Sequence, residues 1–245
     1  MTLALNFDIL RAHTEHNINT SHMRTKTLAL TAALTAAGAL TSMAQVYSVN
    51  IVGYINLNVP QGFSMIANQL NATPDNTLET LLPAPPEGTT IYKFNPAAGS
   101  YYVYLFSADN PGWLPQNGGP AHTTLNPGEG AFVAMPSATA VTLVGEVQLV
   151  STYPLNNGFQ IVSSVIPQSD NLDNLGFPPT EGDFAYQFNH AAGSYYIWQW
   201  SADNPGWAPQ NATPTLIPTP AVGESFFFAT SGGARTWNRT FTVGP

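Results

Sequence analysis

Two aromatic segments hold the residue types that bind ligands by stacking. In residues 101–106 and 195–200 rings recur at every second position, and side chains two residues apart in a strand point to the same face. A row of exposed rings would present large apolar faces to a sugar. The candidate residues are Tyr104, Trp198 and Trp200. The alternative, which we favour, is that these rings fill a hydrophobic core.

A repeated loop supplies the second set of candidates. Its sequence, Ser-Ala-Asp-Asn-Pro-Gly-Trp, occupies residues 107–113 and again residues 201–207. Pro-Gly suits the centre of a type II turn and Asp-Asn can bond to the loop's own backbone, so we favour a structural turn. In the alternative, the Asp binds calcium or a sugar hydroxyl and the Trp stacks on the sugar. The residues concerned are Asp109, Asn110, Trp113, Asp203, Asn204 and Trp207.

The loop is poor in calcium ligands. Calcium takes about six to eight oxygen ligands, and one Asp-Asn pair in each loop supplies too few. The chain has no Cys, and no His cluster has the spacing of a zinc site. We therefore expect no cofactor, with calcium as the weaker alternative.

Residues that could catalyse a reaction are few. His122 and His190 occupy non-equivalent positions of the repeat, and no Gly-x-Ser-x-Gly motif is present. The best pair of acids for glycoside hydrolysis is Glu129 and Glu224, but each follows a Gly in a turn before a strand, so we interpret them as turn residues. We expect no catalytic residues and no enzyme.

An internal duplication must position these residues. Residues 94–117 match residues 188–211 at a constant offset of 94, and 18 of the 24 positions are identical. Short runs rich in Val, Ile, Tyr and Phe alternate with 21 Pro and 20 Gly, and no long stretch has helical spacing, which is typical of an all-β fold. We expect two similar β-sandwich or barrel-like lobes, with the first β repeat in residues 45–147 and the second in residues 148–245.

The same patterns predict the individual elements. No Gly/Ser-rich linker joins the repeats, so we favour lobes that pack together over two separate domains. Asp75 and Asp170 are N-cap types ahead of leucines and predict one helical turn in each repeat. We expect strands near residues 46–59, 63–69, 90–95, 100–107, 131–135, 140–147, 148–153, 159–165, 184–189, 194–201, 225–229 and 237–243.

The N-terminal region predicts export. In residues 23–44, Arg24 and Lys26 precede an apolar run, and small residues stand at the two positions that signal peptidase reads, so we expect a signal peptide cleaved after Ala44. The run is shorter than the roughly 20 residues that cross a bilayer, so no membrane insertion is expected after cleavage. Residues 1–22 are interpreted as an upstream extension without structure. The expected location is secreted, periplasmic or at the cell surface.

The charge balance excludes some partners. The chain has a net charge of −8, with six Lys and Arg against 14 Asp and Glu. Phosphate backbones need clusters of cations, so nucleic acid is not an expected partner. Without Cys, the fold must rely on its core and not on disulfides.

Several short motifs resemble a known group of proteins. They are the Gly-Phe pairs at 62–63 and 158–159, Gly-Glu-Gly-Ala-Phe at 128–132 with its partner Gly-Glu-Ser-Phe-Phe at 223–227, and residues 46–54. Together these resemble signal-peptide-bearing bacterial proteins built from a tandemly duplicated β-rich unit. The resemblance implies export and a duplicated β fold, but that group has no known activity to transfer.

We therefore expect a secreted, non-enzymatic binding or structural protein of the cell surface or extracellular matrix. Carbohydrate is the candidate ligand, so the expected partner is a polysaccharide or another surface polymer. Two similar lobes would give two similar sites, and a polymer that engages both binds more tightly. The alternatives are a secreted polysaccharide hydrolase and a self-associating structural subunit, which long exposed edge strands would favour.

Overall fold

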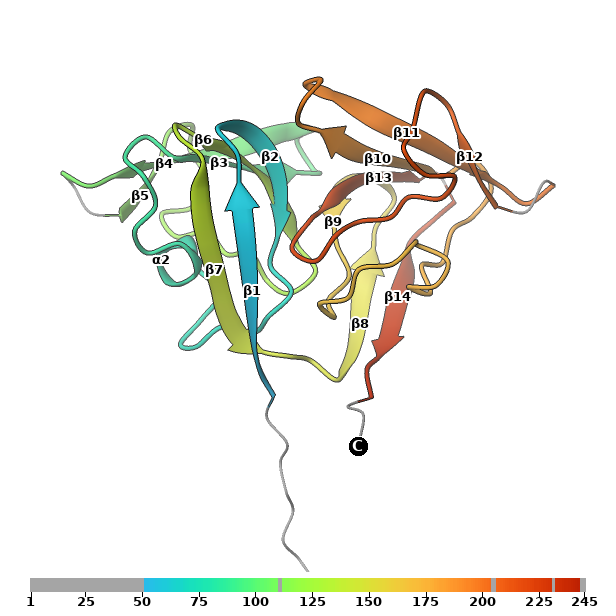
Figure 1. The fold of residues 1–245 in the computed structure, drawn as a ribbon, viewed down its shortest axis with the longest axis horizontal. Coiled ribbons are helices and arrows are strands. Elements are labelled where there is room, and N and C mark those ends of the chain that lie inside the picture. Colours follow the sequence, from blue (N-terminus) through green and yellow to red (C-terminus); the bar gives the residue numbers. More distant parts are fainter. Residues whose placement is uncertain (1–50, 110–111, 204–205, 231, 243–245) are drawn as a thin grey trace, which may run out of the picture. The chain divides into compact units, whose positions relative to one another are not determined.

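The computed structural model describes residues 51–109, 112–203, 206–230 and 232–242 (Figure 1). The upstream extension and the signal peptide predicted for residues 1–44 lie outside the described residues, as do Asn110 and Asn204. The described residues form fourteen strands and one helix of four residues. None of the described helical segments is long and apolar enough to cross a membrane.

The first lobe consists of two antiparallel sheets. Its ribbon pairs β1 (Val52–Val59) with β7 (Thr139–Glu146), and the helix α2 (Leu78–Leu81) lies in the connection between β2 and β3. The larger sheet has the order β2-β6-β3-β4-β5. Its strands are β2 (Gly62–Ala67), β3 (Thr90–Asn95), β4 (Ser100–Ser107), β5 (Gly112–Pro115) and β6 (Gly130–Met135).

The second lobe has the same topology. Its ribbon pairs β8 (Val150–Leu155) with β14 (Arg235–Thr240), and its larger sheet has the order β9-β13-β10-β11-β12 (Figure 1). Each strand of the second lobe takes the place of the strand seven earlier in the first. The strands of the larger sheet are β9 (Gly158–Val162), β10 (Phe184–Asn189), β11 (Ser194–Ser201), β12 (Gly206–Pro209) and β13 (Phe226–Thr230). The predicted fold class, all-β with two similar β-rich lobes, is confirmed.

The strand predictions agree with the structure in place but differ in some bounds and in number. Each of the twelve predicted strands overlaps an observed strand, and those over 90–95, 100–107, 184–189 and 194–201 have the predicted bounds. Residues 46–50 of the first prediction and residue 243 of the last lie outside the described residues. The strands β5 and β12 were not predicted. Each has only four residues, which is too short to show an alternating pattern.

The helical turns also differ from the prediction. In the first lobe Thr77, not Asp75, is the N-cap residue, and the Asp75 carboxylate accepts hydrogen bonds from the backbone N and the hydroxyl of Thr77 at 3.1 and 2.7 Å. In the second lobe no helix forms at this place. The Asp170 carboxylate instead accepts from the backbone N of Asn171 and from the side chain of Asn174, which favours consecutive turns over a helix.

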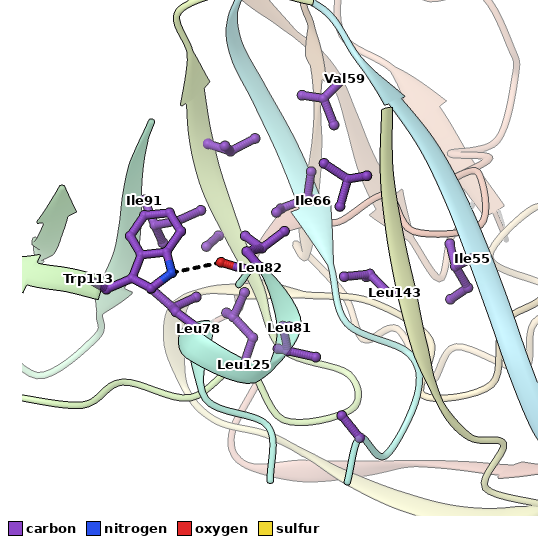
Figure 2. Close-up of a cluster of buried hydrophobic side chains, with 14 of the residues drawn as sticks. Ile55, Val59, Ile66, Leu78, Leu81, Leu82, Ile91, Trp113, Leu125 and Leu143 are labelled. Atoms are coloured by element: carbon purple, nitrogen blue, oxygen red, sulfur yellow. Dashed lines mark hydrogen bonds between the residues drawn. The ribbon is translucent and has the colours of Figure 1, made fainter. Parts of the chain in front are cut away.

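Each lobe has its own hydrophobic core between its ribbon and its larger sheet. In the first lobe the core joins side chains of β1 and β7 to the sheet and to the α2 region, where the indole Nε1 of Trp113 donates to the carbonyl O of Leu82 at 3.1 Å (Figure 2). Burying an aliphatic or aromatic side chain stabilises the fold by about 1.5–3 kcal/mol. The corresponding second core includes Leu155, Phe177, Trp198, Phe226, Phe228 and Trp237.

The two lobes are joined by reciprocal backbone hydrogen bonds. The N–H of Ala67 in the first lobe donates to the carbonyl O of Gly223 in the second at 2.8 Å. The N–H of Ser163 in the second lobe donates to the carbonyl O of Gly128 in the first, also at 2.8 Å. Ala67 and Ser163 occupy equivalent positions of the repeat, as do Gly128 and Gly223. The lobes therefore meet with the reciprocity of an isologous two-fold interface, although they belong to one chain.

Candidate binding site at the junction of the lobes

The aromatic residues selected from the sequence lie in the two cores. The side chains of Tyr104, Trp113, Trp198 and Trp207 are buried, with at most 6% of any of them exposed. Trp200 is partly buried and packs against the second core. Tyr104 and Trp198 therefore fill the cores, which is the interpretation that we favoured for the strand rings. Trp113 and Trp207 of the repeated loops are buried in the same two cores.

The loop residues have a different environment. Asp109 and Asp203 are exposed beyond the ends of β4 and β11. Both turns are held by a carboxylate, because Glu87 accepts from the backbone N of Ala108 and Glu181 accepts in the same way in the second lobe. Among the described residues, no group of three or more His, Cys, Asp or Glu is arranged to hold a metal ion.

The opposite faces of the same strands meet at the junction of the lobes. Because side chains alternate along a strand, Tyr101 of β4 and Tyr195 of β11 point away from the cores that their neighbours fill. They join an aromatic layer on the outer faces of the two larger sheets. The layer contains Phe63, Tyr92, Phe94, Tyr101 and Phe132 of the first lobe and Phe159, Tyr186, Phe188, Tyr195 and Phe227 of the second.

Two equivalent ring pairs connect the lobes within this layer. Phe94 of the first lobe lies 5.4 Å from Phe227 of the second, with an angle of 84° between the ring planes. Phe132 lies 5.3 Å from Phe188, with an angle of 87°. Such edge-to-face pairs contribute about 0.5–1.5 kcal/mol each beyond the area that they bury. The aromatic layer therefore holds the lobes in a defined register.

A pocket of about 490 Å³ opens in this layer, and we call it the junction pocket. The volume falls within the roughly 300–1,000 Å³ of ligand sites. Phe63 at its rim is 48% exposed, and its ring stands at 84° to that of Phe132. The first lobe contributes Gly62, Phe63, Tyr92, Tyr101 and Phe132, and the hairpin between β10 and β11 of the second lobe contributes Phe188, His190, Gly193 and Tyr195.

His190 fastens the hairpin of the second lobe to the rim of this pocket. Its Nδ1 lies 2.8 Å from the carbonyl O of Phe63. Because a carbonyl oxygen only accepts, Nδ1 must carry the hydrogen, and Nε2 of the neutral ring is then an acceptor. The equivalent residue of the first lobe is Pro96, which has no side-chain donor. This contact therefore distinguishes the junction pocket from the corresponding place on the second lobe.

Three of the residues that line the junction pocket are tyrosines. The hydroxyls of Tyr92, Tyr101 and Tyr195 make no hydrogen bond to any residue that the structure describes. Burial raises the pKa of Tyr101 and raises that of Tyr195 to about 12, so both remain protonated donors at neutral pH. The pocket therefore combines apolar ring faces with hydroxyl groups that can bond to a ligand.

The acids considered for hydrolysis are engaged in turns. Glu129 accepts from the backbone N of Asn126 at 2.7 Å, and Glu224 accepts in the same way from Ala221 at 2.9 Å. Lys93 pairs with Glu129 at 3.1 Å, whereas the neutral Gln187 donates to Glu224 at 2.8 Å. Each carboxylate thus stabilises its own turn, as the sequence indicated.

Sequence reasoning missed the junction pocket, although one signal for it existed. Phe63 and Phe159 follow glycines at equivalent places in the two repeats, and both are about half exposed. A large ring retained at an exposed position of both repeats indicates a binding surface.

Comparisons of the chain with protein-family models, with curated proteins and with solved structures find no match.

Proposed function

We propose that this protein is an exported, non-enzymatic binding protein whose ligand is a neutral carbohydrate held in the junction pocket. The observation that carries the proposal is the combination, in one pocket, of an exposed ring face at Phe63 with the hydroxyls of Tyr92, Tyr101 and Tyr195. A sugar has the complementary surface, with an apolar C–H face and hydroxyls around its edge. It can stack on a ring and bond to phenols at the same time.

The composition of the lining favours a sugar over other ligands. Among the described residues, no Asp, Glu, Lys or Arg lines the junction pocket, and the lining His190 is bonded to the carbonyl O of Phe63. A charged ligand would therefore find no permanently charged partner among these residues. A purely apolar ligand would cover the phenol hydroxyls without bonding to them, and an unpaired buried hydroxyl costs about 1–3 kcal/mol. A neutral, polyhydroxylated ring avoids both penalties.

The export part of the proposal rests on the sequence of residues 23–44. An exported protein meets polysaccharides of cell walls and matrices, and the acidic balance of the chain disfavours anionic polymers. A neutral polysaccharide at the cell surface is therefore the proposed partner.

The test is a calorimetric titration of the protein with cellohexaose, laminarihexaose and maltohexaose, with and without calcium. We expect at least one of them to bind, and Phe63→Ala to weaken that binding about tenfold or more because the exposed stacking face is lost. Tyr54→Ala is the matched control, since Tyr54 is a 69% exposed ring outside the pocket. No binding to any of the three oligosaccharides, or equal weakening by both substitutions, would contradict the proposal.

A second candidate function has one observation in its favour. Tyr54 of β1 and Val144 of β7 are direct cross-strand partners, and both are exposed, as is Val52 at the same end of the ribbon. An apolar patch on a two-stranded ribbon would suit a self-associating structural subunit. Sedimentation velocity of the wild-type protein and of Tyr54→Ser tests this. A monomer at every concentration measured would argue against it.

A further inference from the structure

We propose a second carbohydrate site, on the outer face of the second lobe's larger sheet, formed by the rings of Phe159, Phe184 and Tyr186. We call these three residues the aromatic platform. The inference rests on the proposed function, because it assigns the same class of ligand, a neutral sugar, to a second place on the protein. It differs from the junction pocket in that residues of one lobe alone form the site.

The rings of the aromatic platform are neighbours, with one stacked pair and one tilted pair. Phe184 and Tyr186 stack with their centroids 6.0 Å apart and an angle of 26° between the ring planes. Phe159 lies 6.2 Å from Tyr186 at an angle of 36°. In the first lobe the pair equivalent to Phe159 and Tyr186 is Phe63 and Tyr92, whose rings lie 5.6 Å apart at an angle of 47°. Phe184 adds a third ring beside this pair in the second lobe.

The floor of the platform is a single small residue. Ala229 of β13 is the cross-strand partner of Phe159 on one side and of Phe184 on the other. Its short side chain leaves a shallow pocket of about 330 Å³ between the rings. Phe159 is 54% exposed, so the platform is open to solvent. The pocket is lined by Gly158, Phe159, Gly182, Phe184, Tyr186, Ala229 and Thr230.

The platform belongs to the second lobe because the two repeats differ at two positions. Phe159 and Tyr186 have the ring counterparts Phe63 and Tyr92, but the counterpart of Phe184 is Thr90. Near the rim, the first lobe's Pro96 replaces the His190 that fastens the hairpin across the junction pocket. The first repeat thus carries two of these three rings, and the second repeat carries all three.

The polar surroundings of the platform select a neutral ligand. Arg235 and Asp183 form an ion pair, and Arg235 also donates to the hydroxyl of the lining residue Thr230 at 3.0 Å. No charged side chain of the described part of the chain lines the platform. The Tyr186 hydroxyl bonds to no described residue, and burial raises its pKa, so it remains a donor to a sugar hydroxyl.

The substitution that tests the platform introduces the residue that the other repeat has at the equivalent position. Phe184→Thr copies the residue of the first lobe at a position where that lobe folds with Thr90. Phe159→Ala removes the second ring of the same surface. Near-ultraviolet circular dichroism and thermal unfolding verify that each variant is folded.

The experiment follows the aromatic NMR resonances of each site separately while the protein is titrated with cellohexaose, laminarihexaose and maltohexaose. For at least one of these we expect two binding curves, one reported by Phe63 and Tyr92 and the other by Phe159 and Tyr186. Phe184→Thr should weaken the second curve about tenfold or more and leave the first unchanged, whereas Phe63→Ala should do the reverse.

The outcomes separate this inference from the proposed function. Shifts confined to Phe63 and Tyr92 would overturn the platform and leave the junction pocket as the only carbohydrate site. Shifts confined to Phe159 and Tyr186 would support the platform and overturn the assignment of the junction pocket. Shifts at neither site, with all three oligosaccharides, would overturn both. Equal weakening of both curves by Phe184→Thr would show a general structural effect and would also overturn the platform.

Discussion

Gly130 and Ser225 occupy equivalent positions in the two repeats and face each other across the junction of the lobes. A Cβ atom placed on Gly130 would lie 2.2 Å from the Cβ of Ser225 and 2.4 Å from its Oγ. Ser225 is completely buried, and its hydroxyl donates to the carbonyl O of Ile66 in the first lobe at 2.9 Å. A serine at both positions would not fit at this contact. The two repeats must therefore have different residues here for the lobes to pack together.

Gly130→Ser should therefore destabilise the protein. Overpacking of a close contact costs about 1–3 kcal/mol, because the backbones of the two lobes must move apart. The free energy of unfolding in urea measures this cost. The double variant Gly130→Ser, Ser225→Gly exchanges the two residues and should recover much of the loss. An unchanged free energy of unfolding in Gly130→Ser would contradict the close approach.

A second prediction separates backbone strain from close contact. Gly128 has a φ of +92°, and a Cβ placed there would lie 2.5 Å from Cδ2 of Tyr153 in the other lobe. Gly88 has a similar φ of +83°, with no atom within 4 Å of such a Cβ. Gly88→Ala should cost about 1–2 kcal/mol from the left-handed backbone alone. Gly128→Ala should cost about 1–3 kcal/mol more, and equal losses in urea unfolding would argue against the contact.

The two buried indoles predict a third difference. Nε1 of Trp113 donates to the carbonyl O of Leu82, whereas Nε1 of the equivalent Trp207 is buried without a partner among the described residues. Phe at either position loses a similar volume, but only Trp113→Phe also leaves a buried carbonyl without its donor. Trp113→Phe should therefore be more destabilising than Trp207→Phe by about 1–2 kcal/mol. The reverse order in thermal or urea unfolding would contradict this assignment.

Glu224 predicts a pH dependence of stability. Burial raises its pKa above the ordinary 4.5, against the opposing effect of hydrogen bonds from Ala221 and Gln187. An acid whose pKa is raised on folding binds more protons in the folded state, so its contribution to stability falls as the pH rises from about 4.5 through the folded pKa. Glu224→Gln removes this titration.

The free energy of unfolding of the wild-type protein and of Glu224→Gln, measured at pH 4 and pH 7, checks the sign. The wild-type protein should lose stability relative to the variant between pH 4 and pH 7. Glu129→Gln is the matched comparison in the other repeat, where Lys93 supplies a positive partner. A relative gain for the wild-type protein over Glu224→Gln at pH 7 would contradict the raised pKa.

The local pattern of the chain was enough to predict its strands, because alternation and turn residues act over a few positions. Even the exceptions have a local reason. The strands β5 and β12 are too short to alternate, and at Asp170 side-chain hydrogen bonds to Asn171 and Asn174 take the place of a helical turn.

The candidate site could not be found in the same way. In β4 the residues on both faces are aromatic, so Tyr101 and Tyr104 are equally plausible core residues from their types alone. The first core buries Tyr104 completely, and the approach of the second lobe places Tyr101 in the junction pocket. The residue of β4 that was selected as a binding candidate from the sequence, Tyr104, lies on the face that is covered by the core.

The sequence by itself determined the duplication, the strand periodicity and the acidic, cysteine-free character of the protein, since these depend only on the types of the residues and their order in the chain. Only the tertiary structure decided which aromatic face is covered, because that depends on contacts between segments far apart in the sequence, such as His190 with Phe63 and Gly130 with Ser225. Whether a side chain is buried depends on how the lobes assemble. At these positions the alternation of side chains along a strand could not determine which face is buried.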